Sequence, residues 1–213
     1  MAARRAAAGA RGAMTRKERQ QHTRDCLMRS AARVFARRGL EQASIDEVAA
    51  DAGFTKGAFY ANFSSKEELF LEMLDERFSE RLEQIERLSS TGEQVEDQAR
   101  AAGEEFTRFL AADPDWQRLF FAFAAYAARD ERFRVELVRR YERLREGIAA
   151  VYERRSAELG LPLPVAPREL AMMTFAMANG VALERMLEPE SASEDLFGGL
   201  LVIFFAGLRA LAG

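Results

Sequence analysis

Several residue types that define whole classes of proteins are scarce in this sequence. The 213 residues include a single cysteine, Cys26, so no disulfide can form within the chain and disulfide-stapled folds are excluded. Proline is also rare, with 5 residues. The longest apolar run, from Leu196 to Leu208, has 13 residues, whereas a membrane-spanning helix needs about 20. We therefore expect no membrane span, and one thiol in a chain of this size fits a reducing cytoplasm.

Residues that usually carry catalysis or bind metals are scarce too. His22 is the single histidine and lies four residues before Cys26, but two ligands fall short of the four that a structural zinc site usually has. A Cys–His nucleophile pair needs a third group to orient it, and none is evident. Neither G-x-x-x-x-G-K nor G-x-G-x-x-G occurs, so the glycine-rich phosphate loops are missing. We expect a protein that is not an enzyme and that needs no metal or cofactor.

What the sequence does contain favours helices. Hydrophobic residues make up 48% and charged residues 31%, which gives a chain of this length enough apolar material for a core. Ala, Leu, Glu and Arg dominate, and all four are good helix formers. No segment alternates between apolar and polar residues for long enough to predict a strand. We predict an all-α fold of about nine helices, three short ones followed by about six longer ones.

Charge is divided unevenly along the chain. Residues 1–66 contain 13 Lys and Arg against 6 Asp and Glu, a net charge of +7, whereas residues 67–213 carry a net charge of −10. This division suggests that the N-terminal part meets a polyanion, although a solvated basic tail would give the same pattern. Residues 1–20 have no apolar period, and we predict a disordered tail there that either adds affinity for DNA or stays unbound. The cations of this tail are Arg4, Arg5, Arg11, Arg16, Lys17 and Arg19.

Two short helices in the basic segment have the lengths of a helix-turn-helix. Residues 44–47 (Ser-Ile-Asp-Glu) form a capping box, which begins a helix that we expect to stop at Gly53, where a sharp turn is permitted. Thr55 then caps a short third helix that reaches about Asn62. A second capping box, residues 65–68, is expected to begin a long fourth helix.

The short third helix has the features of a DNA-reading element. Phe59 and Phe63 lie four residues apart, so one face can be anchored in a small core. The helix N-terminus offers free N–H groups and partial positive charge to phosphates. Gly57 lets the backbone approach base edges, and Lys56 can reach the O6 and N7 atoms of guanine. Helical hairpins without any DNA role have similar spacing, so this pattern alone leaves a purely structural alternative open.

A dense set of characteristic positions fills residues 23–70. They are Ala31-Ala32, Phe35, Gly39, Ser44, Val48-Ala49, residues 52–57 (Ala-Gly-Phe-Thr-Lys-Gly), Phe59-Tyr60, Phe63 and residues 65–67 (Ser-Lys-Glu). With these positions the stretch resembles the DNA-binding domain of TetR-family transcriptional regulators. Phe54 departs from the family pattern, where a smaller aliphatic residue is usual, and Ala61-Asn62 replaces the commoner histidines. The resemblance implies a helix-turn-helix domain over residues 21–66 and a helical ligand-binding and dimerisation domain over residues 67–213.

The resemblance also implies a set of DNA contacts, made by Ser44, Thr55, Lys56, Gly57, Tyr60, Asn62 and Lys66. The two cap residues would meet phosphates, and the lysine and glycine of the third helix would lie in the major groove. Tyr60 and Asn62 would contact a phosphate or a thymine methyl group, and Lys66 would bind the DNA backbone. Partial core packing of Tyr60 and a solvated Lys66 are the alternatives.

The C-terminal part is expected to hold a dimer interface. Further helices are predicted at about residues 93–112, 114–128, 130–159, 167–188 and 193–211. Apolar residues form a stripe on the fourth of these helices (Leu170, Met173, Met177, Val181), and residues 196–208 are apolar on almost every side. Together with the resemblance this predicts a homodimer through the last two helices, where small residues (Gly198, Gly199, Ala206, Gly207) allow close approach. A plain intramolecular core is the alternative.

The middle helices are rich in aromatic residues, and a family-type effector pocket would be lined by some of them. The candidates are Trp116, Phe120, Phe123 and Tyr126. An aromatic stripe at helical spacing is more often core than pocket, so the core alternative stays open for each residue. A pocket lined by such residues favours an apolar or aromatic ligand. No inward charged constellation stands out, so the sequence does not identify the ligand.

These patterns predict a cytoplasmic, sequence-specific DNA-binding regulator. By the family default it is a repressor that binds a palindromic operator as a homodimer and is released by a small molecule. The alternative is an all-helical adaptor whose basic head binds a protein or membrane surface. Salt-dependent and sequence-selective binding to duplex DNA distinguishes the two.

Overall fold

The computed structural model describes residues 14–90, 94–190 and 193–212 and contains helices but no strand in these ranges. The predicted all-α class is confirmed, and the described ranges hold nine helices. They are α1 (Arg16–Arg38), α2 (Ile45–Asp51), α3 (Lys56–Tyr60), α4 (Lys66–Ser89), α5 (Val95–Ala112), α6 (Pro114–Ala127), α7 (Glu131–Leu159), α8 (Pro167–Leu187) and α9 (Leu196–Ala212). In this part of the chain no helix is long and apolar enough to cross a membrane.

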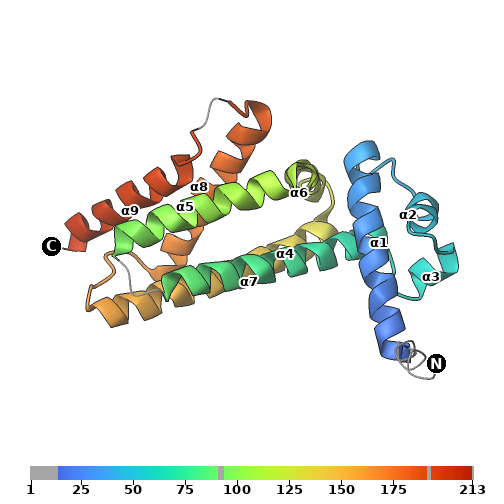
Figure 1. Ribbon diagram of the computed structural model, residues 1–213, viewed down its shortest axis with the longest axis horizontal. Helices are drawn as coiled ribbons and strands as arrows, with labels where there is room; N and C mark the ends of the chain where they lie inside the picture. The colour runs from blue at the N-terminus through green and yellow to red at the C-terminus, as the bar shows by residue number, and fades with distance from the viewer. Residues whose placement is uncertain (1–13, 91–93, 191–192, 213) are drawn as a thin grey trace, which may run out of the picture.

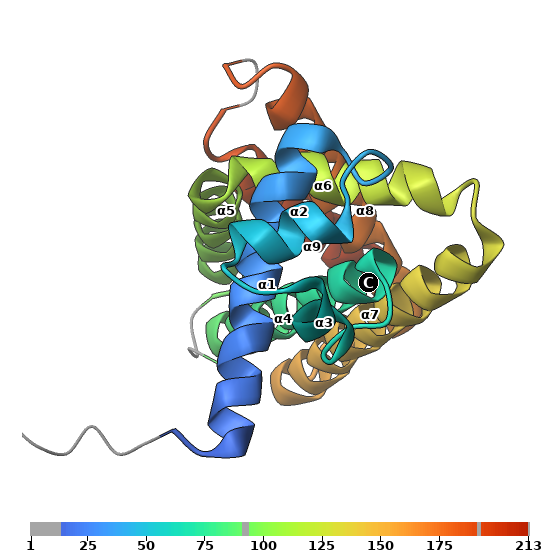
Figure 2. The ribbon, with the colours of Figure 1, turned by 90° about the vertical axis from the view of Figure 1, so that its right-hand side faces the viewer.

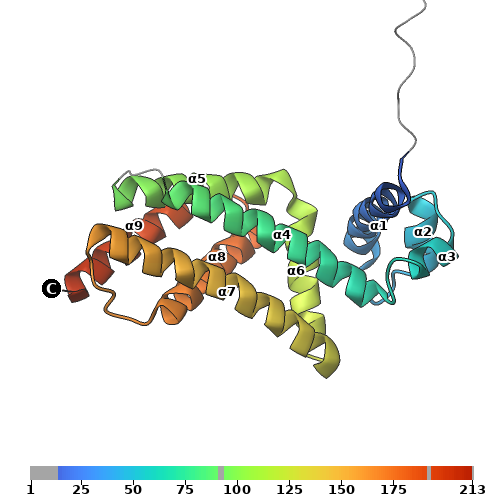
Figure 3. The ribbon, with the colours of Figure 1, turned by 90° about the horizontal axis from the view of Figure 1, so that it is seen from below.

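Helices α1 to α3 form a small head at one end of the molecule, and the other helices form an elongated body (Figures 1 and 3). Seen from the head end, α2 and α3 lie in front of the body beside the long α1 (Figure 2). The head is held together by fully buried side chains, which are Leu27, Val34, Phe35, Val48, Phe59 and Phe63. α4 leaves the head and runs along the body against α7, so one continuous helix belongs to both parts.

The first helix begins earlier than the sequence pattern predicts. The Thr15 hydroxyl accepts a hydrogen bond from the Glu18 N–H at 3.2 Å, and the Glu18 carboxylate accepts one from the Thr15 N–H at 2.7 Å. This capping box begins a helix at Arg16, so the predicted disordered tail is wrong for residues 16–20. The apolar period could not reveal these turns because their side chains are all exposed. Arg4, Arg5 and Arg11 of the predicted tail lie outside the described residues.

Local capping signals place α2 and α4 where the sequence predicts them. Residues 44–47 form the expected reciprocal box, and Gly53 takes a φ of +76° in the turn between α2 and α3. The second box differs in one bond. The Ser65 hydroxyl accepts from the Glu68 N–H at 3.1 Å, but the Glu68 carboxylate accepts from the N–H of Ser64 instead of that of Ser65. The start of α4 is therefore correct, while its reciprocal hydrogen bond is shifted by one residue.

Polar caps and glycines also separate the helices of the body. The Asp113 carboxylate accepts from the Trp116 N–H at 3.0 Å, and Pro114 occupies the first position of α6, where a missing N–H costs nothing. Gly160 ends α7 in the left-handed conformation with a φ of +62°. The helices of the body begin and end within three residues of their predicted bounds.

Two expectations about the last helices need correction. Leu170 and Val181 of the predicted α8 stripe are buried, but Met173 is 44% exposed, because the buried face is centred nearer Ala171 and Thr174 and Met173 lies beyond its edge. α9 is not buried on all sides either, since Ile203 and Leu211 are each 72% exposed. Gly198 serves a contact within the chain, because a side chain at Gly103 of α5 would collide with its backbone. An intramolecular core, which is the alternative to a dimer interface, therefore explains only the inner faces of α8 and α9.

Candidate nucleic-acid interface and effector cavity

The front end of α3 lies open on the surface of the head. Thr55, Lys56 and Gly57 are exposed and Tyr60 is 52% exposed, whereas Phe59 is completely buried and anchors the helix. The Thr55 hydroxyl accepts from the Ala58 N–H at 3.2 Å, which fixes the first turn. The structure thus presents four of the predicted contact residues on one short helix and its cap.

Gly57 leaves the surface of α3 without a side chain at its second position. A Cβ atom added there would meet only the Thr55 hydroxyl oxygen, at 3.7 Å. The fold itself therefore does not require glycine at this position. Close approach of a base edge or a phosphate would explain glycine at this position, because contacts within the chain do not require it.

Lys56 is exposed but has a partner within the head. Its ammonium group donates to the Asp46 carboxylate of α2 at 2.8 Å, and this hydrogen bond raises the pKa of Lys56. Both side chains are more than half exposed, so the ion pair is weak and exchangeable. Ser44, the cap of α2, is also exposed, and its hydroxyl accepts from the Glu47 N–H at 3.1 Å.

The structure gives Lys66 and Asn62 other roles than those predicted. The Lys66 ammonium donates to the carbonyl oxygens of Leu40 and Ala43, at 2.6 and 3.1 Å, and to that of Glu41 at 3.3 Å. Its three N–H groups therefore hold the loop between α1 and α2 against the start of α4. Asn62 is partly buried, and its amide nitrogen donates to the Ala58 carbonyl at 2.8 Å. In the free protein both side chains donate to carbonyl groups of the chain, and their contacts with DNA stay a prediction.

A set of polar contacts between α1 and α2 is not evident from the sequence. The Asp51 carboxylate accepts from the Ser30 hydroxyl at 2.9 Å and from the Arg33 guanidinium at 2.5 Å, and Arg37 lies 3.5 Å away. The Ser30 hydrogen bond, followed by that of Arg33, lowers the pKa of Asp51. The three partners have helical spacing on α1, but their common target is visible only once α2 is placed.

Arg16, Lys17 and Arg19 are exposed at the start of α1.

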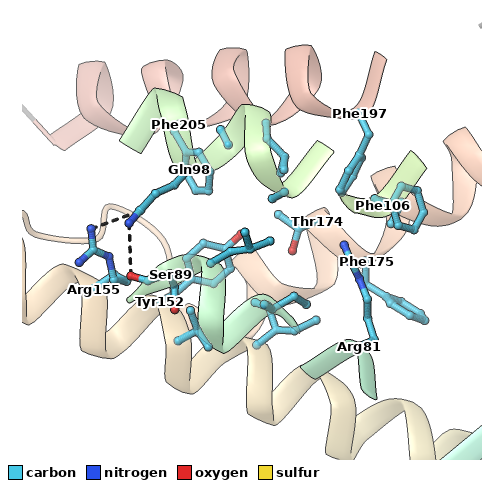
Figure 4. Close-up of a pocket in the computed structure, with 18 of the residues that line it drawn as sticks. Arg81, Ser89, Gln98, Phe106, Tyr152, Arg155, Thr174, Phe175, Phe197 and Phe205 are labelled. Atoms are coloured by element: carbon cyan, nitrogen blue, oxygen red, sulfur yellow. Dashed lines mark hydrogen bonds between the residues drawn. The ribbon is translucent and has the colours of Figure 1, made fainter. Parts of the chain in front are cut away.

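The body encloses a cavity of about 560 Å³ between α4 and the helices from α5 to α9. Its walls are mainly apolar and aromatic, with Phe106, Phe197 and Phe205 on the side of α5 and α9 (Figure 4). A cavity of this size is in the range of small-molecule sites. Two of the predicted pocket residues, Trp116 and Phe120, line it.

The other two predicted pocket residues lie elsewhere. The Phe123 ring is completely buried and stacks on Phe70 of α4, with a centroid distance of 3.3 Å, and its edge packs on Phe35 of α1 at 5.8 Å. Tyr126 packs edge-on against Phe133 of α7 at 5.3 Å. Trp116, Phe120 and Phe123 all belong to one core, in which Trp116 and Phe123 both stack on Phe70. The cavity borders only the first part of α6, and spacing along one helix could not reveal where that border ends.

Polar groups occur at separate points of the cavity wall. Arg155 donates to the Gln98 side chain at 3.1 Å, and Gln98 donates to the Ser89 carbonyl at 3.3 Å (Figure 4). Burial raises the pKa of Tyr152 to about 12. Arg81 of α4 extends into the cavity, and desolvation lowers its pKa to about 10. The sequence held a signal for this charge, because Arg81 lies three residues after Phe78 and four before Ile85, within the apolar stripe of α4.

Two protein-family models together match most of the chain. The model of the bacterial regulatory proteins of the tetR family matches residues 27–73. The model of the BetI-type transcriptional repressor C-terminal domain matches residues 73–202. The first covers the head from the middle of α1 and the start of α4, and the second covers the body as far as the first part of α9.

Curated relatives include proteins described as regulators and one described as an activator. The HTH-type transcriptional activator FasR of Mycolicibacterium smegmatis is 35% identical over 95 residues, which are 45% of this chain and 43% of FasR. The uncharacterized regulator YdgC of Bacillus subtilis is 32% identical over 110 residues, and the match spans 56% of its length. These matches therefore cover only about half of the relatives' own length. The uncharacterized regulator YfiR of Bacillus subtilis is 25% identical over 183 residues, 85% of this chain and 88% of YfiR.

Solved structures with the same fold are also regulators. A transcriptional regulator from Rhodococcus sp. Rha1 has a TM-score of 0.66 and 26% identity, with 87% of this chain and 95% of that chain covered. FadR from Bacillus subtilis, solved in complex with stearoyl-CoA, has a TM-score of 0.70 at 13% identity and covers 84% of this chain and 96% of its own.

Proposed function

The chain belongs to the TetR family of bacterial transcriptional regulators, and we propose that it is a repressor whose homodimer is released from a palindromic operator by a small molecule. The observation that carries this proposal is the free front end of α3, exposed while Phe59 anchors the helix in the head. The name of the matching C-terminal model, BetI-type transcriptional repressor, supports repression. FasR, an activator, represents the opposite outcome. DNA binding also implies a cytoplasmic location.

The proposed DNA contacts come from α3 and the caps of α2 and α3. Thr55 and Ser44 donate their hydroxyl hydrogens to phosphates, and Tyr60 contacts a phosphate or a thymine methyl group. Lys56 leaves Asp46 and donates to a guanine, while Gly57 allows the backbone to approach the base edges. The exposed cations at the start of α1 add salt-dependent affinity for the backbone.

The proposed dimer interface consists of the outer faces of α8 and α9. Large apolar side chains are exposed on both helices, with Met172, Met173, Leu183 and Leu187 on α8 and Ile203 and Leu211 on α9. Gly199 and Gly207 have open space where a side chain would be, so a second copy can approach α9 closely. A twofold pair buries these faces and presents two copies of α3 to one duplex.

The proposed release mechanism acts through α4. One face of α4 between Arg77 and Ser89 lines the cavity, while Lys66 at the first position of α4 holds the loop between α1 and α2. An effector that favours one packing of the cavity walls shifts α4, and with it the spacing of the two heads. FadR, which has the same fold, was solved in complex with stearoyl-CoA, and the long acyl chain of that molecule supports an effector with an extended apolar part.

Selection of bound duplexes from a random pool tests the DNA-binding part of the proposal. We expect a palindromic winner whose affinity falls steeply with salt. Tyr60→Ala is expected to weaken binding to all sequences, and Lys56→Ala to relax the preference at one base pair per half-site by about 1–3 kcal/mol. Gel-shift titrations against the selected duplex and single-base variants measure both effects.

Two results would contradict the proposal. If no sequence is enriched, the head is a nonspecific binder or belongs to an adaptor for proteins or membranes. If both variants bind the selected duplex like the wild type, α3 is not the reading helix.

A further inference from the structure

The cavity contains one arginine that differs from the other arginines of its wall. Three of these have carboxylate partners: Arg77 pairs with Asp113, Arg155 with Glu158, and Arg209 with Glu96. For Arg81 no carboxylate lies within ion-pair distance among the residues that the structure describes. Its guanidinium donates to the Gln84 side chain at 3.3 Å, and its central carbon lies 5.1 Å from the centre of the Phe106 ring.

This arrangement leaves a positive charge inside a mainly apolar space. The nearby carboxylate of Glu105 raises the pKa of Arg81 only in part, and Glu105 itself pairs with Arg108 at 2.8 Å. Desolvation dominates and lowers the pKa to about 10, so the guanidinium is still charged at neutral pH. A desolvated charge without a counterion is costly for the folded chain, and a bound anion removes much of that cost.

A second polar group of the cavity wall also lacks a partner. Gln117 of α6 lines the cavity and is 8% exposed, and its side-chain amide nitrogen is buried without an acceptor within the described part of the chain. A buried donor of this kind favours a ligand that carries an acceptor. Arg81 favours an anionic group and Gln117 favours an acceptor oxygen, and a ligand with a carboxylate has both properties.

We infer that the cavity binds an amphiphilic carboxylate, whose anionic head pairs with Arg81 and whose hydrocarbon chain lies among the phenylalanines of α5, α8 and α9. The inference rests on the proposed function in one respect, because it names the class of effector for that cavity. Phe106, Phe175, Phe197 and Phe205 supply the apolar wall for the chain (Figure 4). The sequence predicts an apolar or aromatic ligand, and the inferred class adds a charged head to an apolar chain.

Three ten-carbon probes, decanoate, decanol and decylammonium, distinguish the contribution of the head-group charge to binding from that of the apolar chain. Trp116 is the only tryptophan of the sequence and lines the cavity, so its fluorescence reports occupancy directly. We expect decanoate to bind at least about tenfold more tightly than decanol, and decylammonium to bind more weakly than either.

Arg81→Met tests whether Arg81 causes this preference. The variant is expected to lose the preference for decanoate over decanol while it retains binding of decanol. Without ligand its melting temperature should rise by about 2–4 °C, because a desolvated charge is replaced by an apolar chain. Arg81→Lys keeps the charge and should keep part of the preference. Arg87→Met, on the exposed part of the same helix, is the matched control and should change neither quantity.

The outcomes separate this inference from the proposed function. Equal affinities for decanoate and decanol, no binding of any probe, or a melting temperature lowered in Arg81→Met would overturn the anionic site, while operator binding by the wild type would leave the regulator intact. If decanoate binds through Arg81 but does not release the selected operator, the ligand class stands and the release mechanism fails.

Discussion

Lys56 and Lys66 differ in what their ammonium groups are free to do. Lys56 has one exchangeable carboxylate partner on the surface, whereas Lys66 donates to three backbone carbonyls of the loop between α1 and α2. The sequence places both lysines at the start of a helix and predicts DNA contacts for both. The difference arises from the position of residues 40–43, which lie more than twenty positions from Lys66, and local spacing does not contain that information.

Gly57→Ala tests, at the scale of one residue, whether the missing side chain serves DNA or the fold. The added methyl group has room in the free protein, and alanine favours helix over glycine, so the free energy of unfolding should rise by up to about 1 kcal/mol. Affinity for the selected operator should fall by about 1–3 kcal/mol, as for a lost base contact. Urea unfolding and gel-shift titration measure the two effects. Unchanged operator affinity would place α3 away from the base edges.

At the scale of elements, α6 packs into one core along its length, but only its beginning borders the cavity. Its beginning supplies Trp116 and Phe120 to the cavity, and Phe123 one turn later fills the junction between α1, α4 and α7. α4 has the same double role, since it starts in the head and lines the cavity further on. These two helices therefore connect the cavity to the head.

Phe123→Ala distinguishes the junction role from the pocket role that the sequence predicts. Removing a completely buried ring should lower the free energy of unfolding by about 3–5 kcal/mol. Decanoate affinity, measured where the variant is still folded, should change little, whereas Phe120→Ala should weaken it because that ring lines the cavity. A variant that unfolds like the wild type but loses decanoate would assign Phe123 to the pocket after all.

Whether the sequence predicts a feature depends on how far apart along the chain the interacting residues are. Helix starts come from contacts between residues three apart, such as Ser44 with Glu47 and Asp113 with Trp116, so they are legible in the sequence. The pairing of Lys66, the burial of Phe123 and the isolation of Arg81 depend on helices that meet only after folding. The sequence does not predict the buried face of α8 correctly for the same reason, because apolar residues lie on both the buried face and the exposed face of this helix.

At the scale of the whole molecule, α9 has an inner and an outer function. Phe197 and Phe205 line the cavity, while Ile203 and Leu211 are exposed on the outside. A ligand in the cavity therefore touches the helix through which the proposed dimer forms. Through α9, occupancy of the cavity by a ligand is therefore linked to the pairing of the two copies and to the spacing of their heads.

Ile203→Glu tests the proposed interface. A charge on the outer face of α9 should convert the dimer into a monomer in sedimentation equilibrium at micromolar concentration and should weaken operator binding by at least about tenfold. Val138→Glu on α7, another exposed apolar residue, is the control and should leave the dimer intact. A wild-type protein that is monomeric at this concentration would refute the interface directly.

The central claim is that two paired copies each place the front end of α3 in the major groove of one duplex. A hydroxyl-radical footprint of the wild type on its selected operator measures this most directly. The account predicts two protected half-sites related by a twofold axis, with centres about one helical turn or a multiple of it apart. A single protected half-site, or protection without any symmetry in the selected sequence, would contradict it.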